Sequence, residues 1–338
     1  MPKVGAHSIQ LKRRDFVPLL LGGAAAVWPR ATPVHEPARP VIGYLGGQSV
    51  DPELLASFRD GLSGLGYSQA HDVMIEFRLA KNDNARLLQL AGELVKDRVA
   101  LIVATGGLVA ARAAKQSTPT VPILFLTALD PVENGLVASF NRPRSNVTGV
   151  FLPYAQVIAK RLEMLKEMLS NPGKIAYLQN DDSAGLGAGG AAQIAAEIHT
   201  AEELGLLVYR ARNERELEAA FALMAKEEID ALLVGADPFF GNQHARIVAL
   251  AARHSLPTGC PRRQFAEVGG LMSYGPSLPK AWRQIGNYAG RILKGAKPDD
   301  LPVRILNDLE LVINKKTADG LGLTVPPLVL AVADKVID

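Results

Sequence analysis

The sequence predicts an α/β fold with two doubly wound parallel-sheet lobes joined by a hinge and a ligand cleft between the lobes. Short apolar runs alternate with amphipathic segments of helical spacing, and the alternation continues through both halves of the chain. The length of 338 residues is about twice that of an average domain. Glycine and polar residues follow the apolar runs, where such a fold binds ligands.

The first half alternates expected strands and helices from residue 41 onward. In its first helix Leu54, Phe58 and Leu62 fall on one face, and Gly66 is placed to end the helix. The expected strands cover 41–45, 73–79, 101–104 and 121–126. The expected helices cover 52–65, 84–98 and an alanine-rich segment that ends at residue 116.

The second half repeats this rhythm. Strand–helix–strand order indicates parallel strands with helices on both faces of the sheet. The expected strands cover 174–179, 206–211, 231–234, 257–260 and 271–274. The expected helices cover 160–169, 191–204, 214–226, 242–254 and 278–293.

The N-terminal segment has the features of an export signal. Arg13 and Arg14 precede an apolar run at 19–27 and resemble a twin-arginine leader. The run is shorter than the roughly 20 residues that a membrane-spanning helix needs. We expect a signal peptide over 1–31 and a proline-containing tether over 32–39. Since Cys260 is the single cysteine, no lipid is attached at the end of the leader, and we expect an exported periplasmic protein that is not a lipoprotein.

The net charge of +3 belongs to the leader. Without residues 1–31 the chain keeps 32 of its 37 basic and 33 of its 34 acidic side chains, a net charge of −1. A nearly neutral body lacks the basic surface that nucleic-acid binding requires. We therefore expect no nucleic-acid partner.

Candidate ligand-binding residues follow the expected strands. Glycines before helices expose backbone N–H groups that suit a carboxylate, aspartates suit an ammonium, and aromatic rings cover an apolar body. Each Asp or Thr could equally cap the helix that follows it, but six such segments converge at one edge of the sheets. The candidates are Gly47, Gln48, Thr105, Gly106, Thr127, Ala128, Asp130, Asn180, Asp237, Phe239 and Tyr274.

The sequence contains no zinc-protease, serine-hydrolase or cysteine–histidine metal motif, so we expect neither an enzyme nor a cofactor. One pattern leaves an alternative open. Residues 185–190 satisfy G-x-G-x-x-G and could serve an exported NAD-type oxidoreductase. Against it, four residues including Asp181 and Asp182 separate the strand from the first glycine, and two carboxylates would repel a pyrophosphate. A cleft-edge loop is the preferred interpretation.

The chain from Val41 to Asp338 resembles the ABC-transporter substrate-binding proteins of the tryptophan/tyrosine type, a branch of the type I periplasmic binding fold. The resemblance depends on many short motifs spread over the chain. They are FRDGL at 58–62 with LGY at 65–67, IVATGG at 102–107, DPV at 130–132, GLVAS at 135–139, NRP at 141–143, NVTGV at 146–150, ADPFF at 236–240, GGLMSYG at 269–275, GRILKG at 290–295 and the tail from ELVIN at 310–314 to ADKVI at 333–337.

The resemblance implies a monomeric solute-binding protein that delivers its ligand to an ABC permease and its ATPase. It implies that the chain crosses between lobes at 146–152 and returns at 269–274, so that residues 40–147 with 276–338 form lobe 1 and residues 148–275 form lobe 2. The expected ligand is an amino acid or related zwitterion. Its carboxylate would bind at Gly47, Gln48, Thr105, Gly106 and Thr127, its ammonium at Asp237 or Asp130, and its apolar part against Phe239 and Tyr274.

Overall fold

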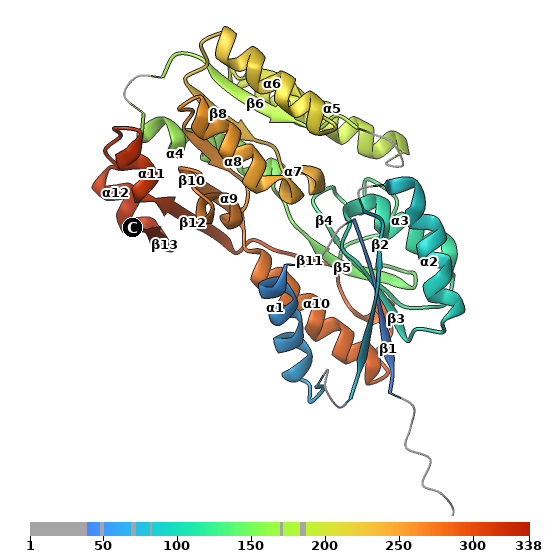
Figure 1. Ribbon diagram of the computed structural model, residues 1–338. Coiled ribbons are helices and arrows are strands. Elements are labelled where there is room, and N and C mark those ends of the chain that lie inside the picture. Colours follow the sequence, from blue (N-terminus) through green and yellow to red (C-terminus); the bar gives the residue numbers. More distant parts are fainter. Residues whose placement is uncertain (1–38, 48–50, 69–71, 82, 170–171, 183–186) are drawn as a thin grey trace, which may run out of the picture. The chain divides into compact units, whose positions relative to one another are not determined.

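The computed structural model describes residues 39–338, apart from 48–50, 69–71, 82, 170–171 and 183–186. The expected signal peptide and the tether up to residue 38 lie outside the described residues. The described part contains two mostly parallel sheets with helices on both faces, which confirms the predicted α/β class (Figure 1).

The first sheet is entirely parallel and contains six strands in the order β11-β5-β4-β3-β1-β2 among the described residues. Its central strands are buried on both faces, which explains why they are continuous apolar runs in the sequence. The strands are β1 (Val41–Gly46), β2 (Met74–Leu79), β3 (Leu101–Ala104), β4 (Ile123–Thr127), β5 (Val147–Phe151) and β11 (Arg304–Ile305).

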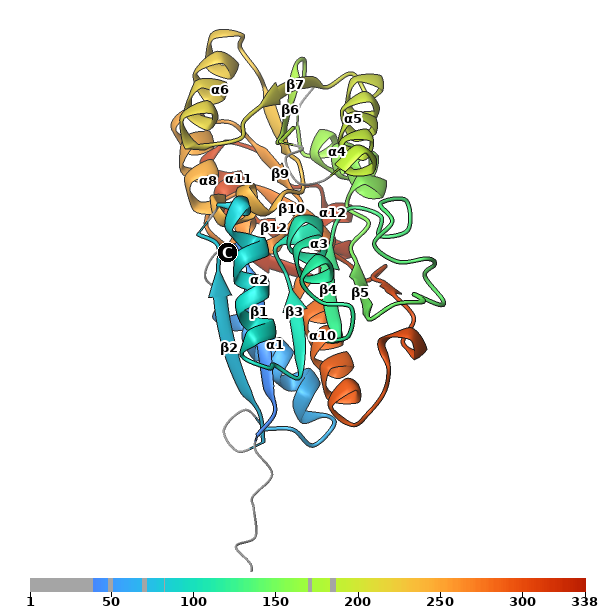
Figure 2. The ribbon, with the colours of Figure 1, turned by 90° about the vertical axis from the view of Figure 1, so that its right-hand side faces the viewer.

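Helices cover both faces of the first sheet. On one face α2 (Leu87–Lys96) and α3 (Gly107–Ser117) pack over β3 and β4, and Figure 2 shows these two helices together in front of the strands. On the other face α1 (Pro52–Ser63) and α10 (Leu278–Leu293) pack on the sheet and on each other. Gly286 of α10 lies so close to α1 that a Cβ there would be 2.0 Å from the Phe58 carbonyl oxygen. Short 3-10 helices are η1 (Asn84–Arg86) and η3 (Pro298–Asp300).

The second sheet has the order β13-β12-β10-β9-β8-β6-β7. Its pairs are parallel except for β10 and β12, which run antiparallel. The strands are β6 (Ile175–Gln179), β7 (Leu207–Arg210), β8 (Ala231–Val234), β9 (Thr258–Cys260), β10 (Met272–Pro276), β12 (Leu309–Asn314) and β13 (Lys335–Ile337).

The helices of the second sheet also divide between two cores. One core contains α6 (Glu214–Lys226), α8 (His244–Arg253) and α9 (Arg263–Glu267), and the other contains α4 (Ile158–Glu167) with parts of α5 (Gly187–Glu203). The remaining short elements are η2 (Ala155–Val157), α7 (Pro238–Asn242), α11 (Lys315–Gly320) and α12 (Pro327–Val332).

The chain passes between the two sheets three times, and the passages differ from the sequence expectation. β5 pairs with β4, so residues 148–151 lie in the first sheet rather than in lobe 2. The segment 278–305 returns to the first sheet through α10 and β11, but β12 and β13 then join the second sheet beside β10. The tail from Leu309 was expected in lobe 1. Its Leu311 and Ile313 instead bury their side chains against the α4 core, which fixes its pairing.

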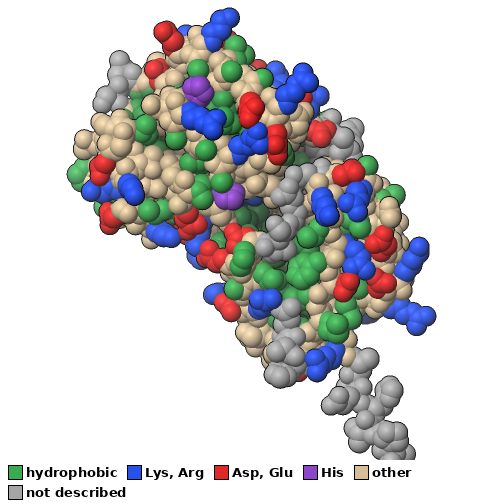
Figure 3. Space-filling view, in the orientation of Figure 1, with side chains coloured by type: hydrophobic (Ala, Val, Ile, Leu, Met, Phe, Trp, Pro, Cys, Tyr) green, Lys and Arg blue, Asp and Glu red, His purple; other side chains and the backbone are tan. Residues whose placement is uncertain are grey.

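Basic and acidic side chains alternate over the surface shown in Figure 3, where no field of one sign is present among the described residues. Among the helices that the structure describes, none is both long and apolar enough to span a membrane.

Candidate ligand-binding site

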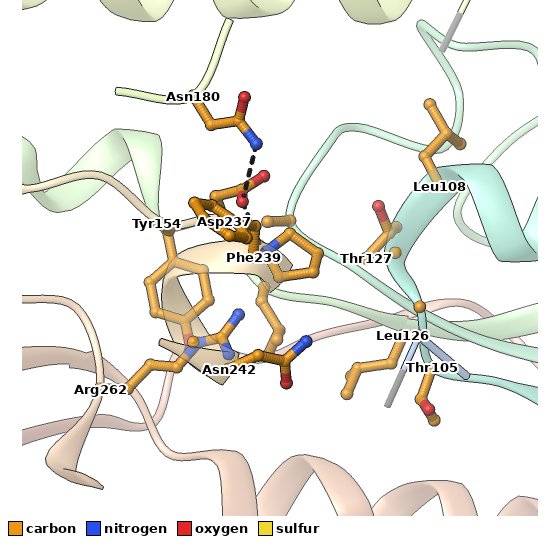
Figure 4. Close-up of a pocket in the computed structure, with 18 of the residues that line it drawn as sticks. Thr105, Leu108, Leu126, Thr127, Tyr154, Asn180, Asp237, Phe239, Asn242 and Arg262 are labelled. Atoms are coloured by element: carbon orange, nitrogen blue, oxygen red, sulfur yellow. Dashed lines mark hydrogen bonds between the residues drawn. The ribbon is translucent and has the colours of Figure 1, made fainter. Parts of the chain in front are cut away.

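A cavity of about 760 Å³ lies where the strand ends of the two sheets meet. Its lining comes from the segments after β3, β4, β6, β8 and β9, as the crevice rule for parallel sheets requires. Figure 4 shows Asp237, Tyr154 and Arg262 from the second sheet and η2 on one side, with Thr105, Leu126 and Thr127 opposite. This cavity is called the cleft below.

The structure brings together eight of the sequence-predicted residues in the cleft lining. They are Gly47, Thr105, Gly106, Thr127, Ala128, Asn180, Asp237 and Phe239. Gln48 lies outside the described residues, and Asp130 and Tyr274 do not line the cleft. The side chain of Asp130 closes a turn, and that of Tyr274 packs against the α4 core.

Asp130 closes a local turn. Its Oδ1 accepts hydrogen bonds from the backbone N–H groups of Val132 (2.7 Å) and Glu133 (3.0 Å). This is the capping role that an aspartate after a strand often has. The expectation that Asp130 faces the ligand is therefore wrong for this conformation.

Tyr274 lies in β10, packs partly buried against the α4 core, and does not line the cleft. Its backbone carbonyl accepts a hydrogen bond from Nε of Arg161 (3.0 Å). Tyr274 therefore contributes to the core rather than to the cleft.

Asp237 is the acidic group at the centre of the second-sheet wall. It is the N-cap of α7, and its Oδ1 accepts hydrogen bonds from the backbone N–H groups of Phe239 (2.7 Å) and Phe240 (3.4 Å). The Asn180 side-chain amide donates to the same oxygen (3.0 Å), as Figure 4 shows. Burial raises the pKa of Asp237, although these bonds and the nearby Arg262 oppose the rise. Asp237 makes no ion pair with any described residue, although the charge of Arg262 acts on it, and it lines the cleft, where a cationic group of a ligand could contact it.

The hydroxyl groups on the first-sheet wall are already engaged. Thr127 Oγ1 accepts from the Leu129 N–H (3.1 Å) and donates to the Leu129 carbonyl (3.3 Å). Thr105 Oγ1 donates to the hydroxyl of Tyr44, and burial raises the pKa of that tyrosine to about 12. Both threonines therefore shape the wall, but neither hydroxyl is left as a free donor.

Several cleft residues were not among the sequence candidates. Tyr154 follows β5, Gln179 ends β6, and Arg262 follows β9. Buried polar atoms without a hydrogen-bond partner include the Tyr154 hydroxyl, Gln179 Oε1, Arg262 Nε and Gln264 Oε1, and all four side chains line the cleft. An unmade buried hydrogen bond costs about 1–3 kcal/mol, so such a concentration indicates a surface that a ligand completes.

A second buried acid borders the cleft on α5. Glu197 lines the cavity, and its carboxylate accepts a hydrogen bond from the hydroxyl of Tyr177. Burial raises the pKa of Glu197 and the pKa of Tyr177. Burial therefore disfavours the charged form of both groups in this part of the wall.

Polar contacts join elements of the two sheets beside the cleft. Gln193 on α5 accepts through Oε1 from the Asp130 N–H (3.0 Å) and from Asn134 Nδ2 (2.8 Å), and donates to Glu133 (2.7 Å). Ile194 next to it packs into the first-sheet core. These contacts hold the α5 region against the segment after β4.

The glycine-rich pattern does not form a strand–turn–helix phosphate loop over its described part. Gly187 to Gly190 belong to α5, which begins earlier than expected, and residues 185 and 186 lie outside the described residues. Cys260 is buried, and burial raises the pKa of its thiol to about 12. In the part of the chain that the structure describes, no group of three His, Cys, Asp or Glu side chains has the arrangement of a metal site.

Two parallel sheets with a cleft between their strand ends define a class of proteins that bind a small molecule in that cleft. A family model described as ABC transporter substrate binding protein matches residues 41–337. The chain belongs to this family and is a substrate-binding protein of an ABC transporter.

Relatives support the same assignment. The "Tyrosine-binding protein" of Clostridioides difficile (strain R20291) is 26% identical over 279 residues, which are 79% of this chain and 75% of that protein. A domain from Streptococcus pneumoniae, crystallised in complex with L-Trp, has a TM-score of 0.76 and 28% identity over 89% of this chain and all of that chain. A conserved domain protein from Vibrio cholerae has a TM-score of 0.75 and 26% identity over 88% of this chain and 99% of its own.

Proposed function

We propose that this protein captures an amino acid or a related zwitterion in the cleft and delivers it to the permease and ATPase of an ABC importer. Family membership supports a transport role. A relative named for tyrosine binding and a similar structure crystallised with L-Trp support an aromatic amino acid as the ligand.

The observation that carries this proposal is the state of Asp237. A desolvated carboxylate that lines a cavity without an ion pair to any described residue is unfavourable by itself, and the nearby charge of Arg262 offsets that cost only in part. The ammonium group of an amino acid would supply the missing charge. Phe239 comes two residues later and lies next to Asp237 in Figure 4, where its ring can cover the apolar part of the same ligand.

Capture would proceed by closure of the two lobes. A ligand shifts the population toward the closed form only by its excess affinity for that form, so residues on both sides of the cleft must contact it. The cleft meets this need because Leu108 and Leu126 face Phe239 from the opposite wall (Figure 4).

Delivery to an importer in a two-membrane bacterium requires export. Residues 1–31 would direct export by the twin-arginine route, and residues 32–39 would connect the cleaved end to the folded part. The mature protein would then act in the periplasm as a monomer without a lipid anchor and without a nucleic-acid partner.

A ligand screen of the purified protein from residue 32 onward tests this proposal. Calorimetry and thermal unfolding against the standard amino acids are expected to show one-to-one binding with a raised unfolding temperature for at least one of them. The amino-acid proposal fails if no amino acid binds. A co-purified nicotinamide with its near-ultraviolet absorbance would instead favour the oxidoreductase alternative.

A further inference from the structure

We propose that Arg262, assisted by the hydroxyl of Tyr154, binds the carboxylate of the ligand, so that the second-sheet wall recognises both charges of a zwitterion. This inference rests on the proposed function and changes the place where the carboxylate of the ligand is expected to bind. The sequence assigned the carboxylate to the loops of the first sheet, whereas the structure places the cation of Arg262 beside Asp237.

Arg262 lies at the cleft without an ion pair to any described residue, and the charges and rings near it are Asp237 and Tyr154. It follows β9 and lines the cavity, and its Nε is buried without a hydrogen-bond partner. The adjacent Arg263 differs, because its guanidinium is surrounded by the carboxylates of Glu53, Glu267 and Glu310. Arg263 is therefore held by ion pairs within the protein, whereas Arg262 can form an ion pair with a ligand.

Tyr154 adds a second unused donor at the same place. Its side chain is 1% exposed and lines the cleft, and its hydroxyl makes no hydrogen bond of normal geometry, although the Arg262 side chain already interacts with it. The Arg262 guanidinium carbon lies 5.9 Å from the centre of the Tyr154 ring (Figure 4). Burial raises the pKa of this tyrosine, so the hydroxyl keeps its proton and can donate it to an anion. A guanidinium and a phenol hydroxyl together suit a carboxylate.

Gly241 leaves the space that the Arg262 guanidinium occupies. A Cβ at Gly241 would be 2.0 Å from Nη1 of Arg262, so any other residue there would displace the charged group. Gly241 belongs to α7, the same short helix that Asp237 caps. One helix thus positions both the acid and the base, and the charge of Arg262 lowers the pKa of Asp237 although no ion pair joins the two side chains.

The first-sheet wall is the competing place for the carboxylate. Its hydroxyls on Thr105 and Thr127 are engaged, as described above. Backbone N–H groups at the start of α3 remain, where Gly106 caps the helix without a side chain. Binding at α3 would leave affinity independent of Arg262, so mutation of Arg262 decides between the two positions.

The experiment combines Arg262 variants with ligands that lack one charge. L-tyrosine, tyramine and 3-(4-hydroxyphenyl)propanoate form one series, and L-tryptophan, tryptamine and indole-3-propanoate form a second. Arg262→Gln is expected to weaken the amino acid and the propanoate about 10- to 150-fold and to leave the amine unchanged. Arg262→Lys should recover part of the loss, and Arg253→Gln, at the exposed end of α8 outside the cleft lining, is the matched control that keeps wild-type affinity.

Each outcome has a separate meaning. Wild-type affinity for the amino acid in Arg262→Gln, with a normal unfolding temperature, overturns the Arg262 assignment and leaves the amino-acid proposal intact. Binding of a propanoate but not of an amino acid, with the loss confined to Arg262→Gln, overturns the amino-acid proposal and supports the carboxylate site. Absence of binding for all six probes, together with no response in the screen of the standard amino acids, overturns both. Gly241→Val provides a second route, because it displaces the guanidinium without removing it and should reproduce the loss for carboxylates.

Discussion

Replacement of Asp237 by Asn tests the role of its charge without removing its structural bonds. The Asn side chain can accept through Oδ1 from the N–H groups of Phe239 and Phe240 and from Asn180, as the aspartate does. Asn is also a favourable N-cap for α7. The substitution therefore removes the charge that the ligand ammonium would contact and little else.

The expected loss of affinity follows from that one contact. A hydrogen bond to a charged group contributes about 1.5–3 kcal/mol, which corresponds to a dissociation constant raised roughly 10- to 150-fold. Isothermal titration with the amino acid found in the screen measures this change. Asp237→Ala provides a comparison, because it also removes the cap and should lower stability by about 0.5–2 kcal/mol.

Asp237→Asn should not destabilise the protein in the absence of ligand. Burial raises the pKa of Asp237 in the folded state above its ordinary value, so protonation favours folding and this contribution is lost as the pH rises through the folded-state pKa. The ionised form of the carboxylate carries a desolvation cost that Asn lacks. Asp237→Asn should unfold at the same or a higher temperature than wild type at pH 7, with the advantage shrinking as the pH falls toward the ordinary Asp range. Unchanged affinity, or a clear loss of stability at pH 7, would refute the reasoning.

Two further predictions concern packing and the contacts beside the cleft. Gly286→Ala should lower the free energy of unfolding by about 1–3 kcal/mol, because its Cβ would be 2.0 Å from the Phe58 carbonyl oxygen. Gly92→Ala in α2 should raise the free energy of unfolding by about 0.5–1 kcal/mol, because a Cβ there meets nothing within 4 Å. Urea unfolding measures both, and equal effects of the two substitutions would contradict the close packing. Gln193→Ala should weaken ligand binding about 5- to 30-fold by removing hydrogen bonds between elements of the two sheets, whereas Gln89→Ala on the exposed face of α2 should not. Titration calorimetry compares them, and equal affinities would show that these bonds do not favour closure.

The fold class could be predicted because buried parallel strands are continuous apolar runs and their helices are amphipathic. The pairing of the tail could not. β12 is an ordinary apolar strand in sequence, and its place beside β10 depends on which core accepts Leu311 and Ile313. That choice is made by contacts with α4, which lies about 150 residues earlier in the chain.

The site was predictable to the extent that it follows the ends of strands. Asp237 and Asn180 were found in this way, and the same rule applied to β9 would have included Arg262. Nothing in the local sequence distinguishes Arg262 from the adjacent Arg263, and a pair of arginines after a strand is typical of a solvated loop. Only the carboxylates that surround Arg263, from α1, α9 and β12, make the difference.

The contact between α1 and α10 has a consequence for synthesis of the chain. Phe58 and Leu62 of α1 are covered by Trp282 and Ile285 of α10, more than 200 residues later. A chain growing on the ribosome would present this apolar face until α10 has emerged, and the first sheet would also lack its edge strand β11 until then. A fragment that ends before Leu278 is therefore a poor candidate for independent expression. We expect it to aggregate or to require a chaperone.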